Sequence, residues 1–332
     1  MSPLTVLYVT GWCRSGSTII GNVLNEVPGC FHTGELSFLW KNAHGNGSNT
    51  LCGCGAQLVD CALWSKVLQQ GVASGETPRE HAERVVRRQQ DTVRTRHTLR
   101  VLRQDTPTPA LREHAELLAK TYRTISDATG ASVIVDSGKF PSEAALLPHV
   151  EGIRPYYLHL VRDPRAVAHS WTKTKQYVVP MSAARSTAYW LGFNVGSELV
   201  TRRYPERSLF LRYEDFIAEP AATVDSLLSL IGVEHSKNPV HVRTVNLGKN
   251  HTVTGNPDRF LSGPTLLRAG DDTWRKELST RAKAVASALA WPLMGRYRYG
   301  RASSPSLHVV HPEPSVNAAD SRSDTFGTGT GQ

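Results

Sequence analysis

The run from residue 4 to residue 24 most constrains the fold, because a strand, a glycine-bounded loop and a helix follow one another there. Residues 4–10 (LTVLYVT) are apolar and rich in β-branched side chains, which is typical of a buried strand. The loop GWCRSGST occupies residues 11–18, and apolar residues then recur at helical spacing until Pro28 and Gly29. Such a loop directs successive backbone N–H groups and a helix N-terminus towards one point, which suits a phosphate-like anion.

This loop has the spacing of a P-loop, GxxxxGK[ST], with one departure. Ser17 occupies the position of the P-loop lysine, and a basic residue, Arg14, lies three positions earlier. An ordinary turn between a strand and a helix is the alternative interpretation. The strand, the helix and the displaced cation together favour an anion site.

A second motif follows a later strand. Residues 156–161 (YYLHLV) are apolar and lead directly into RDPRAVAHSW at 162–171. Pro164 suits the first turn of a helix, where a backbone N–H is not needed. Arg162 leaves the strand just before this helix and Ser170 lies about two turns further on, so a guanidinium and a hydroxyl can converge on a phosphate. The alternative is a basic helix start with a serine on its surface.

Together the two motifs resemble those of sulfotransferases that use 3′-phosphoadenosine 5′-phosphosulfate (PAPS). RSGST at residues 14–18 is similar to the loop that holds the 5′-phosphosulfate in that family, and residues 162–170 are similar to its 3′-phosphate motif. The resemblance covers roughly residues 4–293, but only these two motifs are specific. The donor-binding residues that it implies are Arg14, Ser15, Gly16, Ser17, Thr18, Arg162 and Ser170.

Two later stretches extend the resemblance. HTVTGNPDRF at residues 251–260 resembles a block common in bacterial members, and its Arg259 is expected to be a second cation for the donor, with a surface loop arginine as the alternative. Residues 268–270 (RAG) and Trp274 fit only loosely the family's loop that contacts the 3′-phosphate and adenine.

Two candidate catalytic bases lie in the stretch that follows the first helix. Residues 30–33 form a candidate strand that ends near Glu35, and a carboxylate there could take the proton of an attacking hydroxyl. A glutamate in a first helical turn, favoured by the helix dipole, is the structural alternative. The resemblance favours Glu35, because several sulfotransferase branches place a glutamate after the second strand. His32 is the competing base, since cytosolic members use histidine.

The strand at residues 132–135 is followed by the sequence DSGK. An apolar strand that ends in Asp136 also describes a Walker B carboxylate that binds Mg²⁺, which supports a rival phosphotransferase. The stretch resembles the D-S-[SG]-K element of bacterial sulfotransferases, which implies that Lys139 lies near the transferred group. The catalytic residues expected on this basis are Glu35, Lys139 and Arg14.

Three of the five cysteines, Cys52, Cys54 and Cys61, are closely spaced. They could bind zinc with His32 or His44 as a fourth ligand, although the spacing is not the paired C-x-x-C of a zinc ribbon. The favoured interpretation is a local structural or redox-sensitive cluster, and no metal site is predicted. An odd number of cysteines in a chain of 332 residues is not a disulfide framework.

The net charge of +9 is concentrated in one segment, because eight arginines and only three acidic residues lie between positions 79 and 103. Nucleic acid or an acidic acceptor could bind such a run, but the solvated face of a long helix is the preferred interpretation. Helical patterns at residues 77–104 and 109–129 interrupt the α/β alternation. In the resembled family, insertions here shape the acceptor pocket, so about residues 70–130 are expected to form an acceptor wall.

We therefore expect one α/β domain over residues 1–300, with a central, mostly parallel sheet and helices on both faces, and a disordered tail over 301–332. The implied reaction is sulfuryl transfer from PAPS to a hydroxyl of a carbohydrate, lipid or small metabolite, without metal or nucleic acid. The rivals are a Mg²⁺-dependent phosphotransferase and a non-catalytic anion- or nucleic-acid-binding protein. No apolar stretch spans a bilayer and no signal pattern opens the chain, so a cytoplasmic location is expected.

Overall fold

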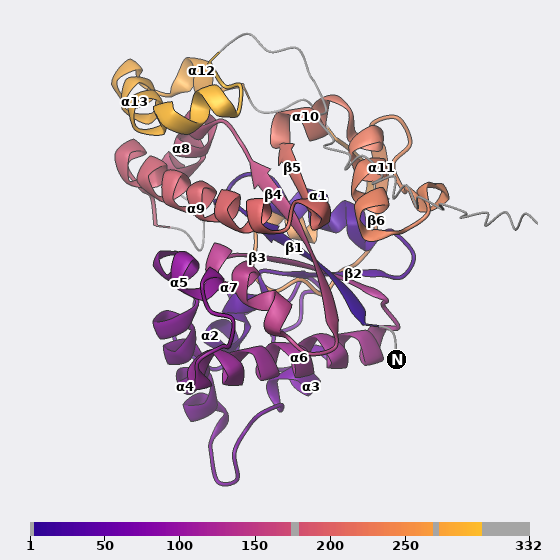
Figure 1. Ribbon diagram of the computed structural model, residues 1–332. Coiled ribbons are helices and arrows are strands. Elements are labelled where there is room, and N and C mark those ends of the chain that lie inside the picture. Colours follow the sequence, from indigo (N-terminus) through magenta and orange to yellow (C-terminus); the bar gives the residue numbers. More distant parts are fainter. Residues whose placement is uncertain (1–2, 174–178, 268–271, 301–332) are drawn as a thin grey trace, which may run out of the picture.

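A five-stranded parallel sheet forms the centre of the molecule (Figure 1). The structure is a computed structural model that describes residues 3–173, 179–267 and 272–300. The expected α/β fold with a mostly parallel sheet is confirmed. In spatial order the strands are β2 (Cys30–Gly34), β3 (Val133–Lys139), β1 (Leu4–Thr10), β4 (Ile153–Val161) and β5 (Ser208–Arg212).

Helices cover both faces of this sheet, because consecutive residues of the strands are apolar and both faces are therefore apolar. In β1, Val6 and Tyr8 enter the core on one face, and Leu7 and Val9 enter the core on the other. The first face is covered by α6 (Pro109–Thr129), α7 (Pro141–Leu146) and part of α9 (Ala183–Arg203). The second face is covered by α1 (Ser17–Asn25), α10 (Tyr213–Ala218) and α11 (Pro220–Ile231).

The helical region expected over residues 70–130 shares the core of the sheet. Val85 and Leu118 belong to the same buried cluster as Tyr8. The region contains α4 (Pro78–Thr92), α5 (Thr98–Leu102) and α6, so the helix expected over residues 77–104 is broken. Several of its arginines pair with glutamates: Arg79 and Arg87 with Glu83, and Arg84 and the largely buried Arg88 with Glu113.

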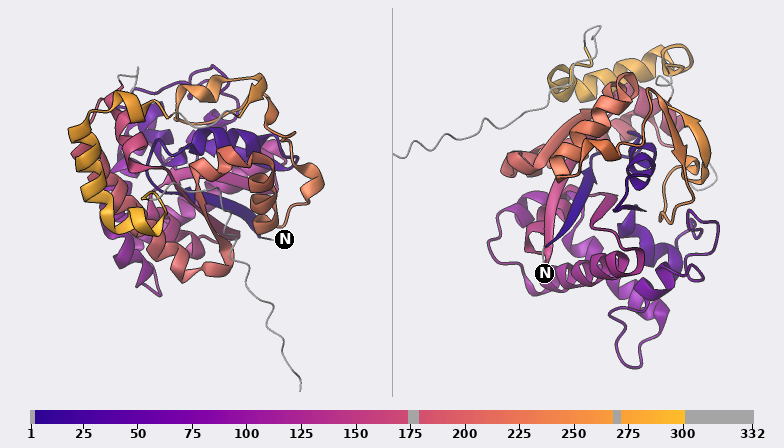
Figure 2. Two further views of the ribbon diagram at one scale, coloured as in Figure 1. Left: turned by 90° about the horizontal axis from the view of Figure 1, so that it is seen from above. Right: turned by 90° about the vertical axis from the view of Figure 1, so that its right-hand side faces the viewer.

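A further cluster of helices adjoins these layers. α8 (Pro164–Thr172), α9 and α13 (Thr280–Arg296) pack together, and α13 lies at the opposite end of the molecule from α6 (Figures 1 and 2). α9 runs from Ala183 to Arg203, and the face that it buries mixes Trp190 and Phe193 with small polar side chains such as Ser197. The remaining helices are α2 (Leu39–Ala43), α3 (Trp64–Leu68) and α12 (Trp274–Glu277).

An antiparallel hairpin of β6 (Thr244–Leu247) and β7 (Gly263–Leu266) was not predicted from the sequence. Each strand has four residues, which is too short for a clear alternating pattern. Within the described ranges, none of the helices combines the length and apolar composition needed to cross a bilayer. The predicted tail over residues 301–332 lies outside the described residues.

His32 connects three elements beneath α1. Its Nε2 lies 3.0 Å from Ser137 Oγ on β3, and its Nδ1 lies 3.3 Å from Asn22 Oδ1 on α1. The ring packs so tightly against Gly21 that a Cβ there would lie 2.2 Å from His32 Cε1. Burial, together with the charge of Lys139, lowers the pKa of His32 to about 3. Burial likewise lowers the pKa of His159 to about 4.

Both histidines should make the fold sensitive to acid. The unfolded chain takes up protons near pH 6.5, whereas the folded chain does so only near pH 3 to 4, so the free energy of unfolding falls as the pH falls through this window. The slope reaches about 1.4 kcal/mol per pH unit for each histidine. His32→Gln should flatten it, as measured by urea unfolding at pH 7.5 and 5. The exposed His241→Gln is the control, and an unchanged slope in the His32 variant would contradict this account.

Candidate active site

A cavity of about 390 Å³ opens where the carboxyl ends of the parallel strands meet. Its walls come from the ends of β1 to β5 and the segments that follow them. β3 lies on one side of β1 and β4 on the other, so the order of the strands reverses at β1. Open α/β sheets bind their ligands at such a switch point. Loops at residues 46–49 and 254–258 complete the wall. The residues predicted from sequence that line it are Arg14, Gly16, Ser17, Thr18, Glu35, Lys139, Arg162 and Ser170.

The loop after β1 presents free backbone donors to this cavity. Gly16, at φ 92°, precedes α1 and provides no side-chain cap for the first turn of the helix. The first N–H groups of α1 therefore remain available to an anion. A Cβ at residue 16 would lie 2.2 Å from the ring of Tyr213, so both the backbone angle and the close approach require glycine.

Basic side chains outnumber acidic ones in the cavity. Arg14, Lys41, Lys139 and Arg162 line it, and the acidic side chains on its wall are Glu35 and Asp258. A ligand with several negative charges fits this excess, and the uncapped start of α1 adds further donors.

The two guanidinium groups are held in place by rings and backbone. Arg14 lies over the Trp171 ring, with 5.1 Å between its Cζ and the ring centroid, and donates to Asn256 Oδ1 at 3.1 Å. Arg162 lies over the Tyr213 ring at 4.9 Å and donates to the carbonyl oxygen of Arg14 at 3.2 Å. The two predicted motifs therefore touch each other across the cavity.

Glu35 and Lys139 form an ion pair at the ends of β2 and β3. Their side chains are 14% and 7% exposed, so the pair is largely withdrawn from water. The backbone N–H of Glu35 donates to Val253 O at 2.7 Å, which fixes the start of this turn. Of the two candidate bases, Glu35 lines the cavity, whereas His32 is buried beneath α1 and does not.

Asp136, the candidate Walker B residue, faces away from the cavity. It is fully buried, accepts a hydrogen bond from Tyr122 Oη at 2.7 Å and another from the backbone N–H of Gly138 at 2.8 Å. Burial, and then the charge of Glu143, raises the pKa of Asp136 to about 7. This environment suits an internal hydrogen-bonding group better than a ligand of Mg²⁺.

A sequence model described as "Sulfotransferase family" matches residues 7–237, which include both phosphate motifs and most of the sheet. The chain belongs to the sulfotransferase family. Membership supports sulfuryl transfer as the general reaction. Among curated proteins, this sulfotransferase has no significant match.

Several solved structures resemble the sulfotransferase over most of its length. The sulfotransferase domain of the Synechococcus PCC 7002 olefin synthase is 21% identical, with 87% of this chain and 95% of that chain covered and a TM-score of 0.47. A sulfotransferase from Alicyclobacillus acidocaldarius is 13% identical, with coverages of 88% and 98% and a TM-score of 0.38. A retinol dehydratase in complex with retinol and PAP is 12% identical, with coverages of 89% and 82% and a TM-score of 0.35. The family assignment depends on the sequence match.

Two residues of the expected donor site do not line the cavity of the sulfotransferase. Ser15 is 2% exposed, and its hydroxyl is buried without a hydrogen-bond partner among the described residues. Arg259 is 1% exposed and donates to Asn49 Oδ1 at 2.7 Å and to Thr252 O at 3.3 Å. It thereby holds together the two loops that form the cavity wall. Arg259 is therefore not a surface loop arginine, and its role as a second cation for the donor stays a prediction.

The structure describes only part of the expected adenine loop. Residues 268–270 lie outside the described residues. Trp274 is buried in a small cluster with Ala166 and Leu278, and Arg165 lies over its ring at 4.7 Å. Trp274 does not line the cavity.

Sequence reasoning missed the positions of Tyr213 and Asn256, which both line the cavity. Glu214 and Asp215 of the stretch 213–216 (YEDF) lie in the first turn of α10. Glu214 also accepts from the backbone N–H of Asp163 at 3.0 Å, next to α8, and burial raises its pKa. The resemblance at residues 251–260 was the available signal for Asn256.

Gly16→Ala should destabilise the sulfotransferase by about 2 to 4 kcal/mol, because it combines an unfavourable positive φ with overpacking against Tyr213. Gly192→Ala in α9, where a Cβ would meet nothing within 4 Å, should instead be neutral or slightly stabilising. Urea unfolding measures both. The cost of Gly16→Ala should shrink in a Tyr213→Ala background, and equal costs in the two backgrounds would contradict the proposed crowding.

Proposed function

We propose that this sulfotransferase transfers the sulfuryl group of PAPS to a hydroxyl group of a carbohydrate, lipid or small-metabolite acceptor. The observation that carries the proposal is the meeting of the two phosphate motifs, in which Arg162 donates to the backbone of Arg14 at 3.2 Å in one cavity. A donor with phosphate groups at both its 5′ and 3′ positions needs two separate anion sites on the same wall. The excess of cations in the cavity supports the same class of ligand.

We assign the donor contacts to the residues that line the cavity. Arg14 and the backbone N–H groups from Gly16 to Thr18 bind the 5′-phosphosulfate, and Arg162 and Ser170 bind the 3′-phosphate. Lys139 stabilises negative charge on the oxygen that leaves with the 5′-phosphate. These fixed cations take the place of a metal ion, so the transfer step should not require Mg²⁺.

Glu35 is the proposed general base. Its carboxylate lines the cavity beside Lys139, where it can accept the proton of the acceptor hydroxyl as the new sulfur–oxygen bond forms. The ion pair with Lys139 orients the carboxylate before the acceptor arrives. Positioning and charge neutralisation are then the main contributions of the protein to the reaction.

The acceptor side is proposed to be the helical region. A small pocket beside the main cavity shares Phe38 and Lys41 with it, and residues of α4, including Val86 and Gln89, form the far wall of this pocket. The region over residues 70–130 therefore lies next to the reaction centre, in support of its role as an acceptor wall.

Both rival functions have less support. A Mg²⁺-dependent phosphotransferase lacks the P-loop lysine at Ser17, and its Walker B candidate, Asp136, is buried away from the cavity. A nucleic-acid-binding protein would use the arginine-rich segment, but several of these arginines are paired with glutamates.

Calorimetric titration with 3′,5′-diphosphoadenosine, without divalent metal, tests the donor. We expect tight binding by the wild type and about 10- to 100-fold weaker binding by Arg14→Ala and by Arg162→Ala, because each loses hydrogen bonds from a charged group. Arg79→Ala, at an exposed position on α4, should bind like the wild type. Tight binding of ATP with Mg²⁺ but not of diphosphoadenosine would overturn the proposal.

Glu35→Gln should lower kcat by at least about 100-fold, because a general base contributes 10²- to 10⁴-fold. It should not weaken the binding of diphosphoadenosine. His32→Gln should keep kcat within a few-fold of the wild type, since His32 does not line the cavity. Mass spectrometry of a sulfated acceptor, found by screening hydroxyl compounds with PAPS, measures both. Loss of activity in the His32 variant alone would assign the base to the histidine.

A further inference from the structure

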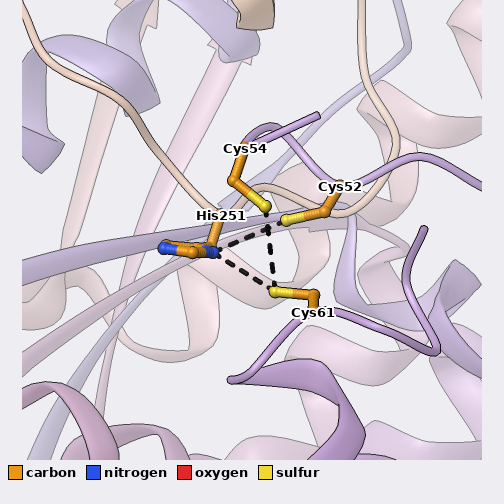
Figure 3. Close-up of side chains that lie close together, drawn as sticks. All are labelled: Cys52, Cys54, Cys61 and His251. Atoms are coloured by element: carbon orange, nitrogen blue, oxygen red, sulfur yellow. Dashed lines mark hydrogen bonds between the residues drawn. The ribbon is translucent and has the colours of Figure 1, made fainter. Parts of the chain in front are cut away.

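Three thiols and one imidazole converge where the loop after α2 meets the segment before the cavity wall (Figure 3). The four side chains are Cys52, Cys54, Cys61 and His251, and their ligand atoms all lie within 4.8 Å of one another. Cys52 and Cys61 are buried, and Cys54 and His251 are partly exposed. This is a closed set of four soft donor atoms away from the transfer site.

Three of the six separations between these atoms lie close to the edges of a coordination tetrahedron. His251 Nδ1 lies 3.7 Å from Cys52 Sγ and 3.3 Å from Cys61 Sγ, and Cys54 Sγ lies 4.0 Å from Cys61 Sγ. Tetrahedral zinc, with Zn–S of about 2.3 Å and Zn–N of about 2.0 to 2.1 Å, holds its ligand atoms about 3.5 to 3.8 Å apart. We propose that Cys52, Cys54, Cys61 and His251 form a structural zinc site.

The local backbone is built to present these thiols. The backbone N–H of Cys52 donates to Ala56 O at 2.8 Å, and that of Gly55 donates to Cys52 O at 2.9 Å, which closes a tight turn with Gly55 at φ 90°. Backbone amides of Cys54 and Ala56 also donate to the sulfur atoms of Cys52 and Cys54. Donors of this kind stabilise thiolates, the form in which cysteine binds metal.

The imidazole is held from the other side. Trp64 Nε1 donates to the carbonyl oxygen of His251 at 2.7 Å, and the backbone N–H of Gly53 donates to Thr252 O at 2.9 Å. The histidine thus faces the thiols from a segment 190 residues away in the sequence from Cys61. The fourth member of the cluster is therefore neither of the two histidines considered from the sequence. His32 lies beneath α1, and neither it nor His44 belongs to the cluster.

A disulfide is a weaker explanation of the same cluster. Three thiols leave one unpaired, and the imidazole has no part in such a bond, whereas a tetrahedral metal uses all four groups. The cysteines would still form a local structural cluster, as the sequence suggested. In contrast to the expectation of no metal, we propose that this cluster binds zinc. The transfer cavity is a separate site, and the zinc site does not depend on the proposed donor.

The zinc would stabilise the loops that form the cavity wall. It would tie the loop over residues 52–61 to the segment that continues through Val253 to Asn256, and Asn256 accepts from Arg14 and donates from its backbone to Thr18 Oγ1 at 3.3 Å. Loss of the metal should therefore loosen the phosphate loop as well as the cysteine turn. The expected role is structural, because four protein ligands close the coordination sphere.

The test is the metal content of the full-length protein, expressed with added zinc, freed of unbound metal and analysed by mass spectrometry for metals. We expect about one zinc per chain in the wild type and in Cys30→Ser, which changes a buried cysteine outside the cluster. Cys61→Ser and His251→Ala should lose most of the zinc. His251→Cys should retain it, since a fourth thiolate also completes a tetrahedral site. Cobalt substitution of the wild type should give the strong visible absorption of a tetrahedral thiolate site.

Thermal unfolding gives an independent readout. A zinc chelator should lower the melting temperature of the wild type and have little effect on Cys61→Ser, which already lacks the metal. A wild type that contains no stoichiometric zinc, contains iron instead, or carries a disulfide between two of the three cysteines would overturn the proposal. None of these measurements uses a substrate, so their failure and failure of diphosphoadenosine binding are distinguishable.

Discussion

The cavity depends on one crowded contact, between the backbone at Gly16 and the ring of Tyr213. The ring comes from the segment after β5, and the loop it touches comes from β1, so the contact spans the sheet from its centre to its edge. Arg162 lies over the same ring and reaches the carbonyl oxygen of Arg14. One aromatic side chain therefore supports both phosphate motifs, which explains why a residue that looks structural in the sequence lines the site.

Charge is arranged differently in the cavity and beneath it. In the cavity, cations exceed carboxylates, and a buried ion pair joins Glu35 to Lys139. Beneath it, burial raises the pKa of Asp136 to about 7 and lowers that of His32 to about 3, because an unpaired charge there would be costly. The charged groups that can contact a ligand therefore line the cavity. Asp136 and His32 instead make internal hydrogen bonds that hold α1, α6 and the strands together.

The sequence predicted what is local and missed what is distant. The loop at residues 11–18 and the motif at 162–171 could be recognised because strand, turn and helix signals lie within about twenty residues. Both motifs follow parallel, neighbouring strands, β1 and β4, and therefore lie at the same end of the sheet. His251 could not be paired with Cys61 in the same way, since only the folded chain brings them together. The burial of Arg259 could not be predicted either, because a pattern gives a residue type and not the direction of its side chain.

The central position of β1 has a consequence for folding during synthesis. β1 leaves the ribosome before the other described strands of the sheet, yet its neighbours are β3 and β4, and Tyr8 pairs with Asp136 and Tyr157. At about 5 to 20 residues per second, this apolar strand waits on the order of ten seconds before its first partner is made. Parallel pairing over such separations is also slow to form. The central strand of the finished fold is therefore the segment of the nascent chain that most needs protection from aggregation.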